Sequence, residues 1–214
     1  SRFVDELIAA SPDIATRFEE RENLTVVTNY PRRQWAEETD PNKHIEPDSQ
    51  CGTHVVYQGL LSRNRGVSTL IRAVESIPER YDVTLTLGGR FGSIEERRAI
   101  ETEIEAADRV EFVEWFPTLD GMIDHLRRAD IGAMCFHPDP NKTAAIHRSN
   151  KLFQYMSAGL PIVVSDIGGW GDFVEEVGCG VPVEPEDHTA IAETIIELID
   201  RPEHRAELGR NGHR

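Results

Sequence analysis

Residues 148–166 contain the side chains whose types and spacing point most directly to ligand chemistry. Ser149 can cap a helix that runs to Ala158, and Gly159 can end it in the left-handed conformation. Lys151 falls in the first turn, where a cation opposes the helix dipole unless an anion binds nearby. The spacing therefore predicts an anion site at the start of this helix. The alternative interpretation is an exposed surface lysine.

A second candidate anion site lies in residues 59–66, which follow a predicted strand. Gly59 allows close approach of the backbone, and Arg63 and Arg65 place two guanidinium groups before an amphipathic helix. Both the helix start and the forked geometry of arginine favour phosphate groups. The alternative is a polar loop with solvated arginines.

Other turns carry weaker signals. Gly88 and Gly89 follow a strand without completing G-x-G-x-x-G, so they indicate close packing, a nearby ligand or a simple tight turn. His137 and Asp139 also follow a strand, but no third ligand at suitable spacing predicts a metal site. The absence of G-x-S-x-G, H-E-x-x-H, P-loop and D-x-D motifs argues against the enzymes that use them.

The elements that must position these residues alternate between strands and helices. Amphipathic stretches at 68–77, 119–129 and 189–199 have apolar residues at helical spacing. Such alternation indicates βαβ units. We therefore expect an α/β, Rossmann-like, doubly wound and mostly parallel sheet with helices on both faces. Short apolar runs predict the strands, at 24–28, 54–58, 83–87, 110–113, 131–135, 161–165 and 180–183.

Composition divides the chain into three parts. Residues 1–30, with an apolar run at 4–11 and a helical stretch at 13–20, resemble the end of another unit. Residues 31–52 are polar, rich in Pro and without a clear period, which predicts a linker. Residues 53–214 form the main predicted domain. After a predicted helix at 202–208, the polar end of the chain indicates truncation.

The charge excludes some partners. The formal net charge is −15, with 38 Asp and Glu and only three lysines. This argues against nucleic acid as a partner, because phosphate backbones require a basic surface. An acidic, lysine-poor composition is typical of halophilic proteins, the alternative being an ordinary acidic cytoplasmic protein. The three cysteines lie far apart, which indicates a protein of the reducing cytoplasm without disulfides. The chain has no apolar run long enough to predict a membrane-spanning helix.

The sequence NKLFQYMSAGLPIVVSD at residues 150–166 resembles the retaining glycosyltransferases of family 4, which have the GT-B fold. Weaker motifs in the family's order surround it, including Tyr57-Gln58-Gly59, Leu87-Gly88-Gly89 and Ala129-Asp130-Ile131. The resemblance covers nearly the whole chain. It implies the C-terminal, donor-binding lobe, with residues 1–30 as a remnant of the N-terminal lobe and the crossover.

The resemblance implies a nucleotide-diphospho sugar donor, such as a UDP- or GDP-sugar, and no required metal or other cofactor. A glycan, lipid-linked or small-molecule acceptor would bind through the absent lobe, in the cytoplasm or at its membrane face. The implied roles are the donor diphosphate for Arg63, Arg65, Gly66 and Lys151; the donor sugar and distal phosphate for Arg148, Ser149, Asn150 and Leu152; the ribose for Gln154; the base for Trp115 and Phe116; and close approach for Gly59, Gly88 and Gly89.

Two positions depart from the family pattern. Leu60 replaces an arginine that many members have, and Gln154 replaces a glutamate that binds the ribose. The catalytic groups of the N-terminal lobe are not in this chain, so it should bind the donor but scarcely turn it over. The alternatives are a non-catalytic nucleotide-sugar-binding module, or a sugar-nucleotide epimerase or phosphorylase on the same architecture.

Overall fold

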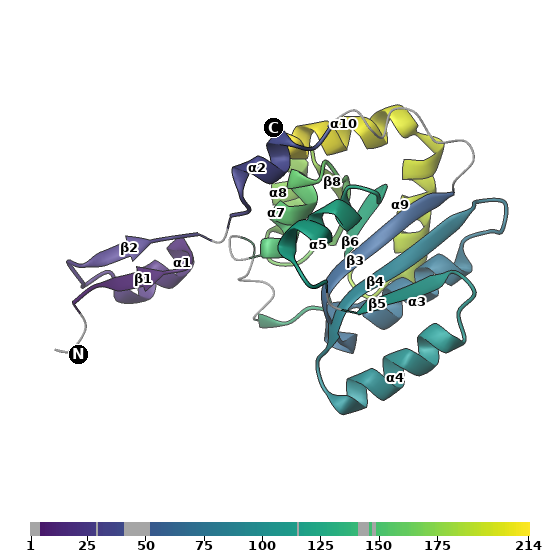
Figure 1. Ribbon diagram of the computed structural model, residues 1–214, viewed down its shortest axis with the longest axis horizontal. Coiled ribbons are helices and arrows are strands. Elements are labelled where there is room, and N and C mark those ends of the chain that lie inside the picture. Colours follow the sequence, from purple (N-terminus) through teal and green to yellow (C-terminus); the bar gives the residue numbers. More distant parts are fainter. Residues whose placement is uncertain (1–4, 29, 41–51, 115, 141–145, 147–148) are drawn as a thin grey trace.

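A computed structural model describes residues 5–28, 30–40, 52–114, 116–140, 146 and 149–214. Its main feature is a parallel sheet of six strands in the order β5-β4-β3-β6-β7-β8 (Figure 1). The predicted strands of this sheet are confirmed, although three of them (β3, β4 and β5) run further than predicted. The strands are β3 Thr53–Leu61, β4 Val83–Phe91, β5 Val110–Glu114, β6 Ile131–Met134, β7 Ile162–Ser165 and β8 Gly180–Val183.

Helices cover both faces of this sheet, as the doubly wound prediction requires (Figure 1). One face carries α3 (Val67–Ser76), α4 (Ile94–Glu105) and α9 (His188–Asp200). The other carries α5 (Leu119–Leu126), α7 (Asn150–Ser157) and α8 (Trp170–Val177). Between them the inner strands are mostly apolar and buried, which is typical of parallel sheets covered on both faces, whereas the edge strand β5 is partly exposed.

The register of the sheet makes one strand project beyond its neighbour. β3 pairs with β4 along its whole length, from Thr53 opposite Val83 to Leu61 opposite Phe91. With β6, in contrast, β3 pairs only at Val55 and Val56. The carboxyl end of β3 therefore extends past β6, toward the start of α7.

The amino-terminal part forms a separate small unit. β1 (Leu7–Ala9) and β2 (Leu24–Val26) make a two-stranded parallel sheet with α1 (Pro12–Ala15), apart from the main sheet (Figure 1). The helix predicted at 13–20 is shorter, because α1 gives way to a 3₁₀ turn at Thr16–Phe18. Ile8 in β1 is 64% exposed, and Val27, which directly follows β2, is 53% exposed, so this unit leaves apolar side chains uncovered.

The described part of the predicted linker contains a short helix. α2 (Arg33–Glu37) buries Trp35, whose indole Nε1 donates to Asp120 Oδ1 of α5 at 2.8 Å. Arg127, the residue that follows α5, also donates from Nη2 to the Trp35 carbonyl, at 2.8 Å. One buried aromatic and its hydrogen bonds therefore hold this polar segment against the domain. Residues 41–51 lie outside the described part.

The last helix, α10 (Pro202–His213), continues past the predicted end at 208. Near its end, His213 Nε2 lies 2.7 Å from the carbonyl oxygen of Ala36 in α2. Cys135 and Cys179 are free and buried. Among the described residues, no helix is both long and apolar enough to cross a membrane.

Candidate functional site

The candidate site lies where the strand order reverses. From β3 the chain continues to β4 and β5 on one side, and it fills the other side with β6, β7 and β8. Open parallel sheets bind ligands at the carboxyl ends of their strands at this switch point. The loop after β3 contains Arg65 and Gly66, and the connection after β6 leads to Lys151. The topology thus brings together the two anion turns predicted from the sequence.

Lys151 is buried rather than a surface lysine. It exposes 8% of its surface, and its Nζ lies 3.5 Å from the centroid of the Tyr57 ring and 5.2 Å from that of Phe136. Cation–π attraction of this kind strengthens when the amine is desolvated. The lysine therefore reaches from α7 back to the carboxyl end of β3 and places positive charge at the switch point.

Glycines are required where these elements meet. Gly59 has φ +136°, and a Cβ there would lie 3.2 Å from Lys151 Nζ. Gly66 has φ +72°, and a Cβ there would lie 1.6 Å from the carbonyl oxygen of Cys135. Gly89 is similarly crowded by the carbonyl of Gly59. The atoms that lie close to these three glycines thus belong to the protein itself. That the glycines also let the backbone approach a ligand stays a prediction.

Arg65 belongs to the same cluster as Lys151. Burial raises the pKa of the Tyr57 hydroxyl well above its ordinary value, and the guanidinium of Arg65 opposes that rise. The Tyr57 hydroxyl donates to the Leu60 carbonyl at 2.8 Å, which holds the ring under the lysine. Burial also raises the pKa of the Cys135 thiol to about 12, so this cysteine stays a neutral packing group.

The start of α7 has the predicted cap. Ser149 Oγ accepts a hydrogen bond from the Leu152 backbone N–H at 3.4 Å, and Gly159 adopts φ +69° after the helix. Leu152 and Tyr155 are fully buried, and the Tyr155 hydroxyl accepts from the backbone N–H of Gln58 at 2.8 Å. Leu152 therefore anchors the helix through packing. Its predicted place near the donor sugar is not tested.

Gln154 lines a cavity of about 270 Å³. α7 contributes Asn150 and Gln154, and α5 contributes Leu119. The opposite wall comes from α2 and the residues just before it, a stretch without the periodic pattern that would have predicted it. Its residues are Tyr30, Pro31, Arg32 and Trp35. Two amides and two aromatic rings give this cavity hydrogen-bonding and stacking groups suited to a nucleoside.

Phe116 lies beside Gly88, and its place near a nucleotide base stays a prediction. A Cβ on Gly88 would be 3.3 Å from the Phe116 ring and 2.3 Å from Gln58 Oε1. Within the described structure, Gln58 Oε1 is buried without a hydrogen-bond partner. The ring of Phe116 also packs on His125, with centroids 5.0 Å apart. Trp115 and Arg148 lie outside the described residues.

A pair of half-buried histidines should make stability depend on pH. Burial lowers the pKa of His54 and of His125, and their rings meet at 5.7 Å. The unfolded chain then takes up protons that the folded chain excludes. The free energy of unfolding should fall below pH ~6.5, by up to ~1.4 kcal/mol per pH unit for each histidine. Urea titrations at pH 7.5, 6.5 and 5.5 measure this slope. His125→Leu should flatten it, and an unchanged slope in that variant would contradict the assignment.

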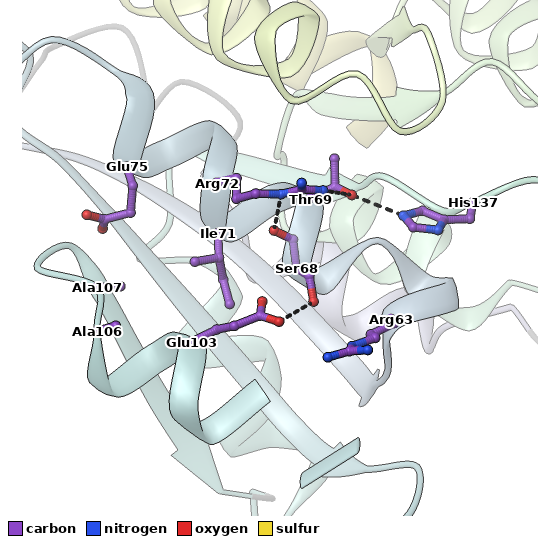
Figure 2. Close-up of a pocket in the computed structure, with 10 residues that line it drawn as sticks. All are labelled: Arg63, Ser68, Thr69, Ile71, Arg72, Glu75, Glu103, Ala106, Ala107 and His137. Atoms are coloured by element: carbon purple, nitrogen blue, oxygen red, sulfur yellow. Dashed lines mark hydrogen bonds between the residues drawn. The ribbon is translucent and has the colours of Figure 1, made fainter. Parts of the chain in front are cut away.

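Arg63 points to a different place from Arg65. Its backbone N–H donates to Glu96 Oε2 at 3.0 Å, and its side chain lines a separate cavity of about 520 Å³ with His137 (Figure 2). His137 Nε2 lies 3.0 Å from Thr69 Oγ1, and His137 Nδ1 lies 3.8 Å from Glu186 Oε2. Among the described residues, no three His, Cys, Asp or Glu side chains are grouped to hold a metal.

Comparison with protein families matches residues 52–201 to the model described as glycosyl transferases, group 1. The match includes all six strands of the main sheet together with Arg65 and Lys151. Spore coat protein SA of Bacillus subtilis is 28% identical over 199 residues, which are 87% of this chain and 50% of that protein. The chain spans half or less of the length of the curated relatives it matches.

Solved structures share the fold. Anabaena HepE in complex with UDP-glucose has a TM-score of 0.74 at 22% identity, covering 99% of this chain and 58% of that chain. The C-terminal domain of LpcC, from the glycosyl transferase group 1 family of Francisella tularensis, has a TM-score of 0.63 at 18% identity. That likeness covers 86% of this chain and 91% of the domain.

Proposed function

Because this chain belongs to the group 1 glycosyltransferases, we propose that it is the nucleotide-sugar-binding, C-terminal lobe of a retaining glycosyltransferase. The observation that carries the proposal is the buried amine of Lys151 at the switch point, beside the Arg65 turn. A sugar transfer of this kind leaves negative charge on a departing nucleoside diphosphate. Fixed positive groups in a desolvated site stabilise that charge most.

In this proposal each anion turn has its own role. Lys151, Arg65 and the start of α7 contact the diphosphate, and Ser149 and Asn150 lie toward the distal phosphate and the sugar. Lysine supplies a compact point charge and arginine a planar fork, so together they suit two linked phosphates. Arg63 faces the other cavity and is not needed for this role.

The nucleoside then extends into the cavity beside Gln154. Its amide can hydrogen-bond a ribose hydroxyl, although it cannot accept from two hydroxyls as a carboxylate does. Phe116 and the aromatic rings near α2 offer surfaces against which a base can pack. HepE was solved with UDP-glucose, which supports a uridine nucleotide as the first donor to test.

Transfer itself requires a second lobe in this proposal. The curated relatives are about twice as long as this chain or longer. A two-stranded parallel sheet is too small to be stable alone, and exposed Ile8 and Val27 leave it uncovered on the described chain. These features support a preceding lobe that completes the small sheet, holds the acceptor and excludes water from the reaction.

A calorimetric titration of the chain with UDP, UDP-glucose and GDP tests donor binding. We expect saturable binding of one nucleotide, weakened at least ~10-fold by Arg65→Gln, because a charge-assisted hydrogen bond is lost. Arg98→Gln on α4 removes the same charge from an exposed position and should leave the affinity unchanged. Equal losses in both variants would contradict a site at the Arg65 turn.

A non-catalytic nucleotide-sugar-binding module is the second candidate, and Gln154 in place of a glutamate favours it. The longer protein distinguishes the two functions. Release of UDP that depends on an added acceptor supports the transferase, whereas binding without release supports the module.

A further inference from the structure

We propose that the cavity between α3 and α4 is a second ligand site, which binds an organic phosphate with an apolar body. The cavity holds about 520 Å³, within the range of small-molecule sites. It lies apart from the Gln154 cavity, and the two share none of their lining residues. Figure 2 shows its walls, with Ser68, Thr69, Ile71, Arg72 and Glu75 on α3, and Glu103, Ala106 and Ala107 along and after α4.

Charge indicates the chemistry of the ligand. In a chain of net charge −15, Arg63 and Arg72 both line the cavity, and within the described structure neither guanidinium pairs with a carboxylate. Arg72 makes only long contacts, with the Ser68 carbonyl at 3.4 Å and Thr69 Oγ1 at 3.5 Å. Two guanidinium groups beside hydroxyl groups fit a phosphate.

The carboxylates that line the cavity accept hydrogen bonds from neighbouring residues. Glu75 accepts from the backbone N–H groups of Asp108 and Arg109, at 3.3 and 2.9 Å. Glu103 Oε1 accepts from Ser68 Oγ at 3.0 Å. Both carboxylates therefore join α3 to α4 and its following turn. They keep their negative charge, but among the described residues neither forms an ion pair with Arg63 or Arg72, so both guanidinium groups can bind an anion.

The rest of the wall is apolar. Ile71, Ala106 and Ala107 line the cavity opposite or beside the charged groups and present methyl groups to it. Burial of apolar surface there favours a ligand whose phosphate is attached to a hydrocarbon or aromatic body. Inorganic phosphate would leave this part of the cavity empty.

The cavity is next to the proposed donor site at Lys151 and Arg65 but separate from it. The 3₁₀ turn at Arg63–Arg65 lies between them, with Arg63 facing the cavity and Arg65 near Tyr57. The His137 backbone N–H donates to the Asn64 carbonyl at 3.2 Å, which joins the same turn to the strand end after β6. A ligand held by Arg63 therefore contacts the turn that carries a predicted donor residue.

Phenyl phosphate is the probe that tests the site, with the alanine methyl groups observed by NMR in the whole chain. We expect the Ala106 and Ala107 signals to shift saturably, at concentrations at least ~10-fold lower than with phenol or inorganic phosphate. Arg72→Gln should weaken binding at least ~10-fold, and Arg98→Gln should not. Lys151→Met should leave the response intact, which separates this site from donor binding.

Three results would overturn the proposal. If phenol binds as tightly as phenyl phosphate, the arginines do not bind the phosphate group. If inorganic phosphate binds as tightly, the apolar wall does not contribute to binding. Shifts that survive Arg72→Gln but vanish in Lys151→Met would place the probe at the proposed donor site instead. Because phenyl phosphate contains no nucleoside, failure here does not bear on the UDP titration.

Discussion

Lys151→Met should lower the affinity of the chain for its nucleoside diphosphate by ~10- to 150-fold, which corresponds to one charge-assisted hydrogen bond. Methionine keeps an unbranched apolar stem against Tyr57 and Phe136, so the packing at the switch point is largely retained. The amine is lost from a site where burial strengthens its interaction with phosphate. Calorimetry with the nucleotide that binds the unaltered chain measures the change.

Two comparisons make this result interpretable. Thermal unfolding of Lys151→Met should be close to that of the unaltered chain, because removal of a buried charge offsets the lost cation–π contact. Arg98→Gln, which removes one exposed positive charge, should bind the nucleotide normally. If Lys151→Met binds normally as well, the diphosphate does not lie at the start of α7.

Gly66→Ala should destabilise the fold by about 3–5 kcal/mol, enough to unfold a large share of a marginal domain. Two costs combine at this position. A left-handed conformation is unfavourable for alanine, and the new Cβ would lie 1.6 Å from the Cys135 carbonyl oxygen. Because that oxygen belongs to the backbone, the turn after β3 or the end of β6 must move. Urea denaturation followed by circular dichroism measures the loss.

Gly169→Ala is the matched control. Gly169 has φ +84°, also in the left-handed region, but nothing lies within 4 Å of the position its Cβ would occupy. Gly169→Ala should therefore lower the free energy of unfolding only by the cost of holding alanine in the left-handed conformation, about 1–2 kcal/mol. Similar losses in the two variants would mean that the contact with Cys135 relaxes freely, and that the turn is not tightly fixed against β6.

The main sheet could be predicted because its strands are apolar runs separated by helical patterns. β6 and β7, for example, consist of four buried residues each, so their sequence carries a strong signal. α2 could not be predicted in the same way. It has five residues in a polar segment, and it is held by Trp35 through contacts with Asp120 and Arg127, far away in the sequence.

The two anion turns were identifiable from residue types, but their geometry was not. The burial of Lys151 depends on β3 projecting past β6, which is a property of strand register. Arg63 and Arg65 are close in sequence, yet they lie on a 3₁₀ turn, where two residues span about 240° of rotation. They therefore face different ways, Arg63 toward the cavity of about 520 Å³ and Arg65 toward Tyr57. The roles assigned to individual residues, and the halophilic origin, stay predictions.

The attachment of α2 to α5 and α10 has a mechanical consequence for the longer protein. Trp35 is bonded to α5 and Ala36 is close to His213, so α2 moves as one body with the main sheet. In the proposed two-lobed enzyme, a hinge between the lobes would then lie before Arg33, in the segment that leads from β2. Because Tyr30 and Pro31 form one wall of the Gln154 cavity, bending of that hinge would open or narrow the cavity. Closure of the lobes in the proposed enzyme would thereby change the affinity of this cavity for a nucleoside.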